Sequence, residues 1–173
     1  MKTLSLLPCV ALLAGCPLLD VKVEVSEACV TETDIAVPGA PDAAAIDQDF
    51  TFSDLGPIHD LLALGGSLEF VRAEVHATSG VTSLDFVDAA HVTIASGDPD
   101  STLPTLDAYD CDGDCNVDDG VALTAAARGD ILDYVAASSL VGHAALVGKP
   151  PATAWTMAVT ACMKGELSKS IGP

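Results

Sequence analysis

The stretch Leu19-Asp-Val-Lys-Val-Glu-Val25 alternates apolar and polar residues at every step. Successive side chains of a β-strand point to opposite faces, so this alternation places the three valines on one face and Lys22 and Glu24 on the other. The pattern predicts a half-buried strand at the start of the folded domain. Because similar runs recur along the chain, this stretch indicates the fold class of the whole protein.

Further β-rich runs follow at regular intervals, with clusters of glycine, proline and aspartate between them. Short strands separated by turn residues, with few helical segments, are typical of an antiparallel sandwich. We therefore predict a mainly β protein, an antiparallel β-sandwich with one or two short helices. The further predicted strands cover residues 29–37, 49–53, 67–78, 85–95, 103–109, 121–127, 140–147 and 153–167.

Two segments interrupt the β pattern and predict short helices. Residues 57–64 begin with Pro57, which suits the first turn of a helix, and end before Gly65, which suits its C-terminus. Residues 131–137 follow Asp130, whose carboxylate is suited to capping a helix N-terminus.

The N-terminus has the features of an export signal. Lys2 supplies a positive start, and residues 3–13 form an apolar run too short to span a bilayer. The run ends in Leu13-Ala14-Gly15-Cys16, which resembles the lipobox of bacterial lipoproteins. The resemblance implies removal of residues 1–15 and a lipid on Cys16. If Cys16 and its amine carry two or more acyl chains, these would anchor the protein stably to a membrane. Residues 16–173 then have about the usual length of one domain, so we predict a single β-sandwich domain.

The cysteine count fits an exported protein. Of six cysteines, one leaves with the signal and one accepts lipid, and the remaining four allow three pairings. We predict Cys111–Cys115 as a local clip turned by Gly113, and Cys29–Cys162 as a staple between the first and last strands. The alternative is four buried free thiols.

Net charge limits the partners. The chain has a formal net charge of −18, which repels nucleic acid and anionic head groups. The resemblance places the domain in the periplasm or on the cell surface, held at an inner or outer membrane. Its expected partner is the membrane, with another envelope protein as a second candidate. The remainder of the chain resembles uncharacterised envelope lipoproteins of myxobacteria-like organisms, without a motif that implies a function.

An aspartate-rich stretch over residues 110–119 is a candidate calcium loop. Asp110, Asp112 and Asp114 alternate and Asp118 follows, a spacing similar to the first ligands of an EF-hand loop. Cys115 stands where that motif has glycine, and no glutamate closes the loop. The alternative is a solvated hairpin tip pinched by its disulfide. Calcium is the one cofactor that the sequence suggests.

The histidines carry less information. Ser79-Gly80 predicts a hairpin between residues 67–78 and 85–95, across which His76 and His91 could meet. Two histidines without a third ligand make a poor zinc site.

No catalytic motif is apparent in the sequence. The sequence therefore favours a non-catalytic lipoprotein that serves as a structural or interaction module. A ligand-binding lipoprotein with a weak calcium site is the alternative, and a hydrolase is the third possibility.

Overall fold

The computed structural model describes residues 19–56, 58, 65–113, 115–117, 120–126, 129–137 and 139–171. The predicted lipid acceptor Cys16, the leader before it and most of the predicted helix over 57–64 lie outside these residues.

Strands make up most of the described chain. Two predicted strands merge into one long β1, and the other predicted strands are all present. A two-residue strand, β6, was not predicted. The elements are β1 (Leu19–Val37), β2 (Ala45–Phe52), β3 (Gly66–Ser79), β4 (Val87–Ser96), β5 (Leu106–Asp112), β6 (Asn116–Val117), β7 (Gly120–Ala125), α2 (Leu132–Val135), β8 (Leu140–Gly148) and β9 (Trp155–Ile171).

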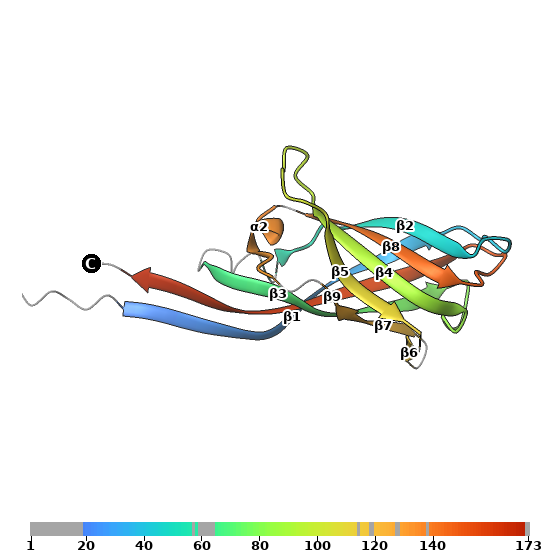
Figure 1. The fold of residues 1–173 in the computed structure, drawn as a ribbon, viewed down its shortest axis with the longest axis horizontal. Coiled ribbons are helices and arrows are strands. Elements are labelled where there is room, and N and C mark those ends of the chain that lie inside the picture. Colours follow the sequence, from blue (N-terminus) through green and yellow to red (C-terminus); the bar gives the residue numbers. More distant parts are fainter. Residues whose placement is uncertain are drawn as a thin grey trace, which may run out of the picture.

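All strand pairs are antiparallel, in the order β1-β9-β3-β7-β5-β4-β8-β2, with β6 beside β7. The strand order divides into two halves, one of β1, β9, β3 and β7 and the other of β5, β4, β8 and β2. The two halves pack on one shared apolar core. The β5–β7 pairing joins the halves at one side, and β1 contacts β2 at the other. The predicted antiparallel sandwich is confirmed, and its two layers are continuous (Figure 1).

Alternation explains which residues form the core. In β8 the buried positions are Leu140, Gly142, Ala144 and Leu146, every second residue. A register shift in the β4–β5 pairing buries two consecutive residues of β5, Ala108 and Tyr109. Among the described residues, every buried side chain is apolar or aromatic, so the core gives no internal site for a charge.

The predicted hairpin between β3 and β4 is wrong. β3 pairs with β7 and β9, whereas β4 pairs with β5 and β8 in the other half of the sheet. The connection after Gly80 crosses between the layers because it carries apolar residues that close the end of the core. Leu84 is fully buried, and the Phe86 ring packs edge-on against Trp155 at 5.7 Å. Periodicity along a strand cannot reveal such a crossing.

The second predicted helix is present and shorter than expected. α2 is preceded by Asp130, whose carboxylate accepts the backbone N–H groups of Leu132 and of Leu68 on β3, each at 3.0 Å. One side chain therefore starts the helix and also fixes it to the sheet. In the part of the chain that the structure describes, no helix combines the length and apolar character needed to cross a bilayer.

The two ends of the described chain lie together. The first residues of β1 pair with the last residues of β9, from Leu19 with Ile171 to Val25 with Gly165. Beyond the start of β3 these strands leave the body as a two-stranded ribbon (Figure 1). The ribbon therefore begins three residues after Cys16.

Candidate functional site

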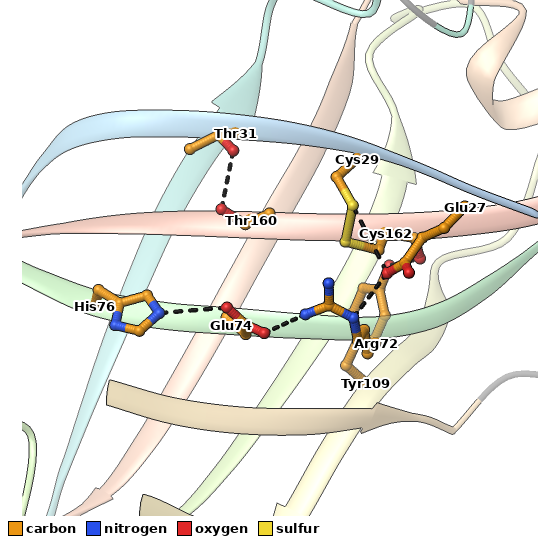
Figure 2. Close-up of a disulfide and its surroundings, with 9 residues drawn as sticks. All are labelled: Glu27, Cys29, Thr31, Arg72, Glu74, His76, Tyr109, Thr160 and Cys162. Atoms are coloured by element: carbon orange, nitrogen blue, oxygen red, sulfur yellow. Dashed lines mark hydrogen bonds and ion pairs between the residues drawn. A yellow bond between two sulfur atoms is a disulfide. The ribbon is translucent and has the colours of Figure 1, made fainter. Parts of the chain in front are cut away.

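Both predicted disulfides form. Cys29 on β1 and Cys162 on β9 are opposite each other in the strand register, with Cα atoms 4.1 Å apart. Cys111 and Cys115 close the turn after β5. The long-range bond lies on the outer face of the β1-β9-β3 layer, and Figure 2 shows the polar residues around it.

A line of charged groups follows β3 beside this disulfide. Arg72 is opposite Cys162 in register, and its Nε donates to Glu27 Oε1 at 2.7 Å. Its Nη1 donates to Glu74 Oε1, and the other oxygen of Glu74 lies 3.4 Å from His76 Nε2 (Figure 2). Arg72, Glu74 and His76 alternate with core residues of β3, so their side chains lie on the outer face of the layer. Each pair is substantially exposed, and exposed pairs stabilise a fold only slightly.

Near the Cys29–Cys162 disulfide, further contacts hold β9 in place on both faces of the layer. From the core, the Tyr109 hydroxyl donates to the carbonyl of Cys162 at 3.3 Å, and its ring packs 5.0 Å from Phe70. Burial raises the pKa of Tyr109 well above its ordinary value. The phenol therefore stays protonated and acts as a structural donor. On the outer face, Thr31 and Thr160 join β1 to β9 through a 2.9 Å hydroxyl contact.

Two histidines on the opposite layer also pair with carboxylates. His143 on β8 contacts two residues of the edge strand β2, through Nδ1 to Asp49 Oδ1 at 2.7 Å and Nε2 to Asp47 Oδ1 at 3.5 Å. The hydrogen bond that His143 donates to Asp49 is the largest cause that raises the pKa of His143. His91 on β4 contacts Asp107 on β5 at 3.3 Å.

The expected meeting of His76 and His91 does not occur. His76 lies on β3 opposite Gly120 of β7, where a Cβ atom would come within 2.5 Å of its ring. His91 lies on β4 between β5 and β8. The two strands belong to different layers, so these histidines share no site. His59, which belongs to the helix predicted over residues 57–64, lies outside the described residues.

The aspartate-rich stretch is fixed to the rest of the fold. Gly113 adopts a φ of 72°, as the tight turn requires, and its N–H donates to the carbonyl of Asp88 at 3.1 Å. Cys115 is only 1% exposed and belongs to the core, so the Cys111–Cys115 disulfide also joins the turn to the core. Asp110 and Asp112 are exposed on one face of β5. Asp114 and Asp118 lie outside the described residues, and the calcium site stays a prediction.

One group of metal-ligand types gathers within the described ranges. Oxygen and sulfur atoms of Glu27, Cys29 and Cys162 lie within 4.8 Å of one another. The two sulfur atoms are bonded to each other. Since a thiolate is the form that binds a metal, this cluster is a disulfide beside a carboxylate and not a cation site.

A shallow hollow of about 450 Å³ opens at the base of the ribbon, between β1, β9, β3 and the turn before α2. Two ion pairs lie at or beside its rim, Lys164 with Glu69 at 3.1 Å and Lys22 with Glu166 at 2.6 Å. The hydrogen bond from Lys22 lowers the pKa of Glu166. Sequence reasoning missed this hollow, because it depends on the register of three strands. Its lining includes Glu24, Ser26, Ser67, Glu69, Asp130 and Lys164.

Comparison with known proteins adds little. No protein family and no curated protein matches the chain. A solved structure titled "Desmodium yellow mottle tymovirus" is 11% identical, with a TM-score of 0.32 over 100% of this chain and 98% of that one. Another solved structure, titled for the promiscuous specificity of carbohydrate-binding modules of the β-sandwich superfamily, is 12% identical. Its TM-score is 0.29, over 81% of this chain and 54% of that one. At such scores neither likeness carries an argument, and the site's own geometry has to support any function.

Proposed function

We propose that this chain is a non-catalytic lipoprotein of the cell envelope, tethered to a membrane through Cys16, whose β domain serves as a structural or interaction module. The observation that carries the proposal is the order of residues at the N-terminus. A basic start, an apolar run, Ala14-Gly15 and Cys16 follow one another, and β1 begins at Leu19. A lipid on Cys16 would hold the folded domain close to the membrane surface.

The polar chemistry of the described faces supports a durable module. Carboxylates and bases that lie close together pair with each other across strands, as Glu27 does with Arg72 and Glu69 with Lys164. Two disulfides are the covalent links expected of a protein in an oxidising compartment. The disulfides stabilise the sheet, whereas the exposed ion pairs add only slightly to its stability.

The acidic surface supports a protein partner rather than a lipid or nucleic acid one. A formal charge of −18 repels anionic head groups, so the lipid on Cys16, and not the domain surface, would make the membrane contact. The partner that such a surface suits is another envelope protein with a basic face. The domain would meet it in the periplasm or outside the cell.

The tether can be tested by expressing the full chain and the Cys16→Ser variant in a bacterial host. We expect the wild type in the membrane fraction, with an N-terminal peptide that begins at a lipid-modified Cys16. The Cys16→Ser variant should keep its leader. Cys9→Ser is the matched control, since Cys9 also lies in the N-terminal segment and should leave processing unchanged. Soluble wild-type protein that begins elsewhere would refute the proposal.

A further inference from the structure

The outer face of the layer formed by β5, β4, β8 and β2 carries an apolar strip. These four strands lie side by side, with β4 and β8 in the centre (Figure 1). Val141 and Val147 of β8 are 40% and 45% exposed, and they are the two exposed large hydrophobic residues of the described chain. Exposed apolar residues gathered on one face indicate a contact surface. Besides two histidines, the outward residues paired between β4 and β8 are uncharged: Ala89, Thr93, Ala95, Val141, Ala145 and Val147.

Acidic residues border this strip on both sides. On β5, Asp107, Asp110 and Asp112 lie opposite outward residues of β4, and on β2, Asp47 and Asp49 lie opposite outward residues of β8. The sequences of these four strands contain no lysine or arginine, whereas β1, β3 and β9 of the other half all do. The face therefore has an apolar centre and a charged rim, as protein interfaces do.

The two histidines of this face belong to its acidic margins. His143 contacts both aspartates of β2, and His91 contacts Asp107 of β5. Each imidazole therefore lies toward the nearer margin and leaves the strip to small and apolar side chains. Within the described residues, the carboxylates of Asp110 and Asp112 have no partner. Five carboxylates face two imidazoles, so the face stays acidic whether or not the histidines are charged.

We propose that this face binds an amphipathic helix of a partner protein, laid along β4 and β8, with an apolar stripe on the strip and lysine or arginine on both flanks. β5 and β2 are three strand spacings apart, which is about 14 Å. A helix with its side chains is about 10–12 Å across, so bases on its flanks would meet the two acidic margins. The inference names the contact surface of the interaction module proposed above, and it rests on that proposal.

The charges favour such a helix over other occupants. A second copy of this chain would bring aspartates against aspartates, because the four strands supply no lysine or arginine to lie between them. Like charges placed against each other across an interface suppress binding. Anionic lipid head groups are repelled in the same way. A helix with basic flanks instead matches both margins and covers the exposed valines.

A synthetic peptide provides a defined probe for the full chain. Outward residues 141–147 of β8 span about 20 Å, which corresponds to a helix of about 14 residues. The probe has this length, with leucines along one stripe, lysines on both flanks and a fluorophore at one end. The control peptide has the same composition, but its lysines lie on the side opposite the leucines. By fluorescence anisotropy, we expect the probe to bind several-fold more tightly than the control peptide.

Matched variants of the chain locate the site. Asp110→Lys should weaken binding of the probe several-fold, whereas Glu24→Lys, the same charge change at an exposed position of β1, should weaken it far less. Val141→Thr with Val147→Thr keeps the net charge and the preference for strand, and it should also weaken binding several-fold. One nonionic detergent is used throughout, so peptide taken up by micelles contributes equally to every titration.

Three results would overturn the proposal. Equal effects of Asp110→Lys and Glu24→Lys would show that the probe responds only to overall charge. Unchanged binding to the double threonine variant would show that the apolar strip makes no contact. Sedimentation of the chain alone should show no self-association through this face, and a dimer that the double threonine variant abolishes would show that a second copy covers it. Mass spectrometry of the same preparation reports lipid attachment separately, so either proposal can fail while the other holds.

Discussion

Removing the Cys29–Cys162 disulfide should destabilise the domain far more than removing Cys111–Cys115. The first bond joins residues 133 apart in the sequence, and the second joins residues four apart. In the loop-entropy description a disulfide acts mainly by restricting the unfolded chain, and its effect grows with the logarithm of the loop. The long bond then contributes about 5 kcal/mol at 25 °C, and the short bond about 2 kcal/mol.

These values convert to measurable shifts. A domain of this size loses about 3 °C in Tm for each kcal/mol. Cys29→Ala with Cys162→Ala should therefore lower Tm by about 15 °C, and Cys111→Ala with Cys115→Ala by about 6 °C. The urea m-value should rise in the first variant, because its unfolded chain is no longer held compact and exposes more surface.

Far-UV circular dichroism measures Tm during heating and the m-value during urea titration, for the wild type and for the two double variants. The ladder between β1 and β9 continues on both sides of Cys29, so the folded sheet should keep its strand signal in the first variant. Equal losses of Tm in the two double variants would refute the entropic reasoning. A larger loss for Cys111→Ala with Cys115→Ala would show that burial of Cys115 in the core outweighs loop length.

Three further predictions follow from the chemistry described above. Cys16→Ser should shift the protein's mass by the whole retained leader and remove the acyl groups, and intact mass spectrometry of the membrane and soluble fractions distinguishes the outcomes. Calcium at ten times a dissociation constant of about 10⁻⁴ to 10⁻³ M should raise Tm by roughly 3–6 °C. Magnesium should raise Tm by less than calcium does, and the double variant Asp112→Asn with Asp114→Asn should show no difference between the two ions. An equal rise in Tm with both ions in the wild type would show that the aspartate-rich stretch is a solvated turn and not a calcium site. The raised pKa of His143 means that its charged form stabilises the fold below pH of about 6.5, and that this contribution is lost as pH rises through the raised pKa. NMR titration should show that Asp49→Asn moves the pKa of His143 down towards its ordinary value, and an unchanged titration would contradict the assignment of the cause.

Local patterns in the sequence predict much of this fold. Alternation locates the strands because each buries one face, and Asp130 locates α2 because a carboxylate satisfies free N–H groups at a helix start. The Cys111–Cys115 pairing is favoured because Gly113 permits a tight turn, and the even cysteine count then leaves Cys29 and Cys162 to pair with each other. These features depend on residues close together in the chain or on the chemistry of one residue type.

Partner strands depend on the whole core and could not be predicted in the same way. The connection after Gly80 looks like a hairpin turn locally, yet Leu84 and Phe86 carry it across the end of the core. The pairing of His143 with Asp49 requires the β2–β8 register, which neither strand encodes alone. Sequence reasoning therefore located the histidines on strands and missed their carboxylate partners.

The position of the Cys29–Cys162 bond has a mechanical consequence for a chain held at Cys16. A pull on the anchor acts along the axis of β1, so it shears the ladder between β1 and β9 rather than opening its bonds one at a time. Because Cys29 is covalently joined to Cys162 of β9, residues 19–28 cannot slide along β9 without stretching, and a β-strand is already nearly fully extended at about 3.3 Å per residue. The disulfide therefore transmits the load from β1 to β9, so the tether lengthens very little under tension while the ladder behind the disulfide stays paired.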